Sequence, residues 1–198
     1  DALNNRGMIL ENRQRIDEAL RSYESAIGSN PDHAEALANR GNLLQAAGRI
    51  EDALQSYERA LAVQPENAEI HWNRSVCRLL EGDFAEGWRE YEWRWQVEPQ
   101  RSARRTFRQP LWLGEEPLAG RTILLHAEQG LGDTIQFCRY SRQVAQRGAN
   151  VILEVPASLK PLLQNLDGVA SVLAEGENLP DFDFHCPLMS LPLAFKTD

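Results

Sequence analysis

The sequence predicts an α-solenoid of three helix pairs followed by a partial α/β unit with a parallel sheet. Two observations favour this fold class. A 34-residue repeat runs through about residues 1–97, and from Thr122 the apolar pattern changes to short runs separated by a glycine loop and an amphipathic stretch. Between the two patterns lies a segment, 99–121, punctuated by Pro and Gly, which we interpret as a linker.

A shift of 34 residues superimposes the same residue types along the first half of the chain. Small residues in such a pattern let helices approach closely, an aromatic fills the gap, and Pro interrupts the chain before the next pair. We therefore expect three antiparallel helix pairs, at 1–33, 34–67 and 68–98. The aligned sets are Asn5-Arg6-Gly7 with Asn39-Arg40-Gly41 and Asn73-Arg74-Ser75, Ala19 with Ala53, Tyr23 with Tyr57 and Tyr91, Ala26 with Ala60, and Pro31 with Pro65.

These positions resemble the tetratricopeptide pattern of Gly, Ala, aromatic, Ala and Pro at fixed offsets. The third unit departs from it, with Ser75 for Gly, Gly87 for the first Ala and Arg94 for the second. Its aromatic stripe either caps the array or docks the following domain, as terminal repeats do, or it binds a ligand. The stripe consists of Trp88, Tyr91 and Trp95.

A recurrent asparagine is the main functional signal of this half. Asn5, Asn39 and Asn73 form a ladder of equivalent positions along one face of the solenoid. An amide side chain both donates and accepts, so it can pair with the backbone of an extended peptide of any sequence. The repeats of O-linked N-acetylglucosamine transferase, which these resemble, use this position to hold substrate polypeptide. The alternative is that each Asn bonds a neighbouring helix.

A recurrent arginine stands beside each asparagine. Arg6, Arg40 and Arg74 could form surface ion pairs with the many nearby carboxylates, each of which contributes little. The other interpretation is that they contact an acidic peptide.

The region 122–198 begins as a βαβ unit. Apolar runs at 123–125 and 151–155 flank a glycine loop and an amphipathic stretch that reaches about Arg147. We expect a further helix near 158–166 and strands near 169–173 and 182–186. The connection rule for such units predicts a parallel, Rossmann-like arrangement.

The segment from His126 to Phe137 lies where the first strand hands over to a helix. Ligands bind at this end of parallel strands, and free amides at a helix start can hold phosphate or sugar oxygens. It is a weak dinucleotide fingerprint, because Ile135 stands where a third Gly is needed. Candidate substrate-binding residues are His126, Glu128, Gln129, Gly130, Gly132 and Thr134, and His185 has a weaker claim.

This loop also resembles the first loop of heptosyltransferase-like glycosyltransferases of the two-lobed GT-B type. Together with the stretch from Asp183 to Pro192, it is similar to bacterial proteins that join repeats to a transferase. The resemblance implies that Asp133 is the catalytic base, taking a proton from an acceptor hydroxyl. Alternatively, Asp133 at the N-cap and Gln136 three residues later form a capping box.

The resemblance places the nucleotide-sugar donor site in a second lobe, and only 122–198 follow the linker. We therefore expect a protein-interaction scaffold carrying an incomplete, inactive acceptor-side lobe, with no cofactor of its own. The alternative is an active glycosyltransferase when the full-length chain is present. Because the chain lacks an initial Met and stops at Asp198 without a terminating element, we expect an excised fragment.

Composition limits the partners. The net charge is -8, and residues 1–98 carry 18 acidic and 11 basic side chains, which disfavours nucleic acid. Cys77, Cys138 and Cys186 form no metal-ligand or disulfide pattern, which favours a cytoplasmic protein without a metal. No apolar run is long enough for a membrane span. We expect a protein or peptide partner and possible self-association through the open sheet edge.

Overall fold

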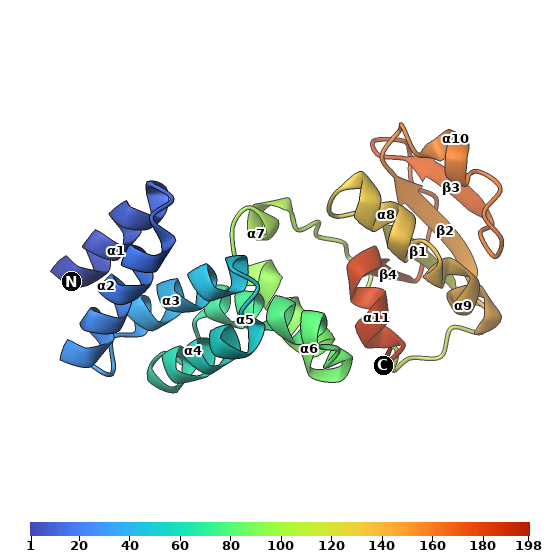
Figure 1. Ribbon diagram of the computed structural model, residues 1–198. Helices are drawn as coiled ribbons and strands as arrows, with labels where there is room; N and C mark the ends of the chain where they lie inside the picture. The colour runs from blue at the N-terminus through green and yellow to red at the C-terminus, as the bar shows by residue number, and fades with distance from the viewer. The chain divides into compact units, whose positions relative to one another are not determined.

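The computed structural model describes residues 1–198, which form two compact units, Asp1–Ser102 and Ala103–Thr197. In the first unit, antiparallel helix pairs follow one another along the chain (Figure 1). Its helices are α1 (Ala2–Asn12), α2 (Ile16–Ser29), α3 (Ala34–Ala46), α4 (Ile50–Val63), α5 (Ala68–Glu81), α6 (Phe84–Tyr91), the 3-10 helix η1 (Glu92–Gln96) and α7 (Gln100–Ala103).

The repeated glycine and tyrosine fix the distance between the two helices of a pair. Tyr57 of α4 is fully buried, and a Cβ on Gly41 of α3 would lie 2.6 Å from its ring. The Tyr57 hydroxyl lies 2.8 Å from Oε1 of Gln45, one turn further along α3. Gly7 and Tyr23 make the equivalent contact in the first pair, so the predicted role of these positions is confirmed.

The third pair ends in a cluster of aromatic rings around a buried cation. Arg94 of η1 is fully buried, with its guanidinium 4.8 Å from the Tyr91 ring and 4.4 Å from the Trp95 ring. Its Nη1 donates to Oε1 of Glu92 at 2.6 Å. The arginine that replaces the second repeat Ala is therefore held by aromatic faces and one carboxylate.

The second unit is built on a four-stranded parallel sheet with the order β3-β2-β1-β4. The helix α9 packs against β2, and α8 and α11 both pack against η2. The strands are β1 (Thr122–His126), β2 (Asn150–Val155), β3 (Ser171–Ala174) and β4 (Phe184–Pro187), and the helices are α8 (Leu131–Phe137), α9 (Tyr140–Gln146), α10 (Lys160–Leu163), η2 (Leu188–Ser190) and α11 (Leu191–Ala194).

The parallel sheet confirms the expected βαβ start, but two expected helices differ. The amphipathic stretch that was expected to run to Arg147 is divided into α8 and α9 by a turn at 138–139. The helix expected at 158–166 is reduced to α10. Pro161 lies in the first turn of α10, where its missing backbone N–H removes no hydrogen bond within the helix.

From Ala103 onward, the segment interpreted as a linker belongs to the second unit. Leu111 forms a parallel bridge with His185 of β4, and the Trp112 N–H donates to the His185 carbonyl at 2.9 Å. The Trp112 ring is fully buried and donates through Nε1 to the Glu116 carbonyl at 2.9 Å. The chain itself thus adds a short backbone pairing beside β4, at one edge of the sheet.

A glycine-to-alanine pair tests the helix contact. We expect Gly41→Ala to destabilise the helical unit by about 1–3 kcal/mol, because the new methyl group overlaps the Tyr57 ring. Gly28 of α2 has no atom within 4 Å of a built Cβ, so Gly28→Ala is expected to stabilise the same unit by about 0.5–1 kcal/mol through helix propensity. Urea unfolding followed by helical circular dichroism measures both. Equal midpoints for the two variants would contradict the contact.

Candidate functional site

A hollow of about 270 Å³ lies between α3 and α5. Its walls are mainly amide side chains, joined by two carboxylates and two apolar residues. The lining residues are Glu35, Ala38, Asn39, Asn42, Gln64, Asn67, Glu69, Ile70 and Asn73.

Two members of the asparagine ladder reach this hollow, and each also bonds the preceding repeat. Asn39 Nδ2 donates to Oδ1 of Asn4 at 3.1 Å, and Asn73 Nδ2 donates to Oδ1 of Asn42 at 3.0 Å. An amide nitrogen has two hydrogens and an amide oxygen two lone pairs, so each side chain retains a donor and an acceptor. The helix-bonding interpretation is therefore correct for Asn39 and Asn73, and it leaves room for a ligand. Asn5 is exposed on α1.

The charged residues of the hollow repeat with the same period. Glu35 and Glu69 are 34 residues apart, and each stands four residues before a ladder asparagine. That spacing puts carboxylate and amide on the same helix face, one turn apart. Asp1 holds the equivalent position before Asn5. No Lys or Arg lines the hollow.

The recurrent arginines lie outside this hollow. Arg40 Nη1 donates to the Ser56 hydroxyl at 2.6 Å, and Arg74 Nε lies 3.0 Å from each carboxylate oxygen of Glu90. Arg74 therefore forms the ion pair that one interpretation expected, but with a Glu90 side chain that is only 7% exposed, so the pair is buried and does not lie on the surface. The repeat pattern could not predict this pair, since Glu90 replaces a serine of the earlier repeats.

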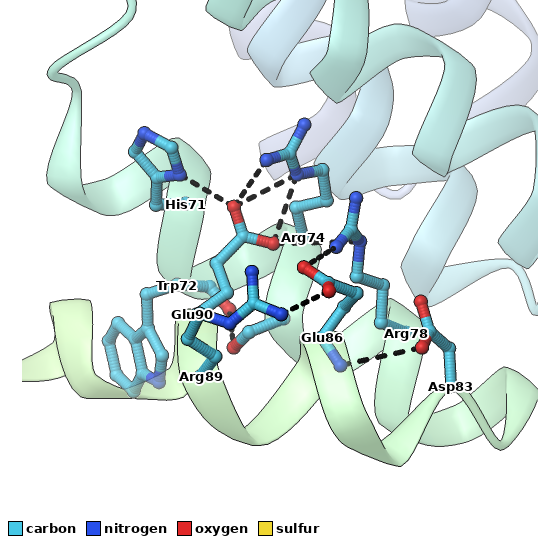
Figure 2. Close-up of polar contacts among 9 residues, drawn as sticks. His71, Trp72, Arg74, Arg78, Asp83, Glu86, Arg89 and Glu90 are labelled. Atoms are coloured by element: carbon cyan, nitrogen blue, oxygen red, sulfur yellow. Dashed lines mark hydrogen bonds and ion pairs between the residues drawn. The ribbon is translucent and has the colours of Figure 1, made fainter.

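The Glu90 carboxylate has further polar neighbours from α5, one a histidine and one an arginine (Figure 2). His71 Nδ1 lies 2.5 Å from Oε1 of Glu90, and Arg78 Nε lies 3.6 Å from Oε2. The His71 ring stacks on Trp93 with centroids 4.1 Å apart, and its Nε2 lies 2.7 Å from the Pro65 carbonyl. A buried acid with this many partners is well compensated and ties α5 to α6.

In the second unit, polar residues gather at the carboxyl ends of the strands. His126 ends β1 and pairs in register with Glu154 of β2, and both are buried. His126 Nε2 lies 3.4 Å from Nδ1 of His185 in β4. Arg105, from the segment 103–121, forms an ion pair with Glu154.

An aromatic ring from the same segment covers both histidines. Phe107 lies with its centroid 5.5 Å from that of His126 and 4.7 Å from that of His185. The Arg105 guanidinium lies 4.8 Å from the Phe107 ring. Phe107 was not a sequence candidate, because a region resembling a linker gave no reason to place it at a strand end.

The glycine loop follows β1, and α8 begins at Leu131 with Gly130 as its N-cap. Asp133 is therefore the third helical residue, and the prediction that it forms the N-cap with Gln136 as partner is wrong. Its Oδ2 accepts from the Gly130 N–H at 3.1 Å, which is one half of a capping box. Because Gly130 has no side chain, it cannot accept the second hydrogen bond of a capping box from the Asp133 N–H.

The other loop candidates occupy different environments. Thr134 is buried and its hydroxyl donates to the Gly130 carbonyl at 3.2 Å. Gly132 is exposed in the first turn of α8, while Glu128 and Gln129 are half-buried before it. The loop thus holds polar groups at a strand end, and part of their bonding capacity stabilises the start of α8.

No group of three or more His, Cys, Asp or Glu side chains could hold a metal ion. None of the helices combines the length and apolar character needed to cross a bilayer.

Comparison with known proteins places the helical unit in a family. Residues 4–53 and 38–92 match the family model of the tetratricopeptide repeat, so this part of the chain is a tetratricopeptide array. The predicted repeats are confirmed, and the model leaves the α/β unit unmatched. A search of curated proteins finds no match.

Several solved structures are similar to the chain. A tetratricopeptide repeat protein from Parabacteroides merdae is 27% identical over 48% of this chain and 38% of that one, with a TM-score of 0.45. The Sgt2 domain from Aspergillus fumigatus is 25% identical over 47% and 62%, with a TM-score of 0.45. The first such domain of Spaghetti, solved with an HSP90 peptide, is 19% identical over 50% and 78%, with a TM-score of 0.47.

The buried histidine of β4, His185, predicts a pH dependence of folding. Burial lowers the pKa of His185, and the charges of Arg104 and Arg105 lower it further. Below its ordinary pKa of about 6.5 the unfolded chain binds more protons here than the folded chain, so stability is present above that pH and is lost as the pH falls towards the folded pKa.

We expect His185→Gln to flatten this slope, which cannot exceed about 1.4 kcal/mol per pH unit for one histidine. Urea unfolding of the whole chain between about pH 7.5 and pH 5 measures the slope in both proteins. The same slope in the variant would show that His185 does not carry the dependence.

Proposed function

We propose that the helical unit is a scaffold that binds an extended peptide in the hollow between α3 and α5. The observation that carries this proposal is the pair of ladder amides, Asn39 and Asn73, which line one hollow and each retain a donor and an acceptor. Backbone groups of an extended chain offer the complementary acceptor and donor, so affinity would come from main-chain bonds.

The charge of the hollow indicates which peptides it favours. Glu35 and Glu69 stand one turn from the ladder amides without a Lys or Arg among the lining residues. A Lys or Arg side chain of the ligand would gain from these carboxylates, whereas an acidic ligand would be repelled. We therefore expect a polar or basic segment, and the earlier alternative of an acidic peptide held by the arginines does not apply to this hollow.

A matched pair of variants tests the ladder. Asn39→Ala removes a groove amide and its bond to Asn4, whereas Asn4→Ala removes the same bond from the buried side and keeps the groove amide. We expect Asn39→Ala to weaken binding about fivefold, the effect of one neutral hydrogen bond, and Asn4→Ala to leave affinity within about twofold.

The probe is a blocked, fluorescent ten-residue peptide of alternating Lys and Ser, followed by anisotropy at low salt. The same peptide with Glu for Lys serves as the charge control. Binding of the Glu peptide alone, if Asn39→Ala weakens it, would contradict the charge preference proposed for this hollow. Binding of neither peptide would contradict the scaffold function.

A second candidate function concerns the α/β unit. We propose that it is the acceptor-side lobe of a bacterial, GT-B-like glycosyltransferase, Rossmann-like in fold, which acts on a protein or glycan only in the complete protein. The parallel sheet and the polar glycine loop at the end of β1 support this. In this proposal Asp133 is the base, and His126, Glu128, Gln129, Gly130, Gly132 and Thr134 surround the substrate.

The base assignment is tested by Asp133→Asn in the complete protein. An amide can still accept from the Gly130 N–H, so the start of α8 is expected to persist, while sugar transfer should fall at least about 100-fold with loss of the base. Release of nucleotide from a nucleotide-sugar panel measures transfer, and thermal unfolding checks the fold. Transfer within about threefold of the unchanged protein would remove Asp133 as base.

A further inference from the structure

The 34-residue register allows each repeat to serve as a reference for the next. Arg40 of the second repeat corresponds to Arg74 of the third, and Ser56 corresponds to Glu90. In both repeats the arginine contacts the residue at the second position. The two sites therefore share an architecture and differ in whether a carboxylate is present.

In the third repeat the arginine has a carboxylate of its own. Arg74 Nε lies 3.0 Å from both oxygens of Glu90, and Arg74 Nη2 lies 2.5 Å from Oε1 (Figure 2). A guanidinium presents its donors as a planar fork that matches a carboxylate, so this position is well suited to an acid.

In the second repeat the equivalent cation lacks such a partner. Arg40 Nη1 donates to the neutral Ser56 hydroxyl, and the only carboxylate oxygen within 4.0 Å is that of Glu24, 3.8 Å from Nε. The Arg40 side chain is 21% exposed, so most of it is withdrawn from water. A largely desolvated cation whose nearest counter-ion is 3.8 Å away gains from binding an anion at hydrogen-bond distance.

The space for that anion is present. A hollow of about 330 Å³ opens beside Arg40 between α2 and α4, and Arg59 and Gln55 also line it. Glu24 is its single acidic residue, so two guanidiniums face one carboxylate. The hollow is thus electropositive within an acidic helical unit.

We propose that this hollow is a carboxylate-binding site, in which a ligand's carboxylate pairs with Arg40 as the Glu90 carboxylate pairs with Arg74. Arg59 supplies a second cation, and Gln55 can donate through its amide. The site is separate from the hollow between α3 and α5 and does not depend on peptide binding there.

The carboxylate can come from a free small acid or from a Glu or Asp side chain of another protein, and two probes distinguish them. Glutarate represents the free acid, and a blocked peptide of alternating Glu and Ser represents the side chain. Titration of the whole chain, followed by the NMR signals of arginine Nε–H groups, is expected to shift the Arg40 signal with at least one probe. A shift of the Arg40 signal with glutarate alone would indicate a small-molecule site, and a shift with the peptide would indicate a protein partner.

Arg40→Gln is expected to weaken binding about tenfold, the effect of a charge-assisted hydrogen bond. Arg13, which lies outside the hollow, provides the control in Arg13→Gln, with affinity within about twofold. Failure of both probes to shift the Arg40 signal would overturn the proposal, as would equal binding by Arg40→Gln and the unchanged chain.

A second experiment places the carboxylate in the chain itself. Ser56→Glu reproduces the third-repeat arrangement, and we expect it to fold with an unchanged or higher Tm and to abolish probe binding. Ser22→Glu is the matched control, because Ser22 is as buried as Ser56 but donates to the Leu3 carbonyl, while Arg6 is exposed. That control should lower Tm by several degrees, since a buried charge without a close partner is costly. If Ser56→Glu lowers Tm as much as the control, Arg40 does not accept a carboxylate.

Discussion

The contact between a helix glycine and a buried tyrosine is the constraint on which the helical unit depends. Gly41 lets α3 approach Tyr57 of α4 more closely than a residue with a Cβ could, and Gly7 does the same for Tyr23. Since interiors are packed to near-crystalline density, this contact fixes the spacing of the pair. Its recurrence every 34 residues brings the other repeated positions into line. The amides and carboxylates of the hollow between α3 and α5 are spaced by that repetition.

A shared scaffold with substituted positions explains why two repeats offer different chemistry. The third repeat neutralises its arginine internally, because Glu90 replaces the serine of the earlier repeats and His71 and Arg78 add to its compensation. The second repeat keeps Ser56 and leaves the Arg40 guanidinium beside a hollow. The residue at this position in the register thus decides whether the arginine forms a buried ion pair or bonds a hydroxyl beside a hollow.

The strand-end cluster of the α/β unit depends on residues that are distant in sequence. Arg105 pairs with Glu154, and Phe107 covers His126 and His185, although the segment 103–121 has the Pro, Gly and charge content of a linker. Burial of Glu154 at the end of a strand requires a cation nearby, and the segment supplies it. The same segment pairs with β4 through Leu111, at one edge of the sheet.

The sequence by itself determined the helical repeats, their period and the existence of a parallel βαβ unit, because these follow from local periodicity and from residues that recur at fixed spacing. It also placed the asparagine ladder and the glycine loop. Only the tertiary structure decided the use of each group: that Asn39 and Asn73 bond the preceding repeat, that Asp133 caps Gly130, and that Arg40 faces a hydroxyl where Arg74 faces an acid. Such pairings depend on which side chains meet in space across helices and strands, and sequence spacing within a single element carries no information about them.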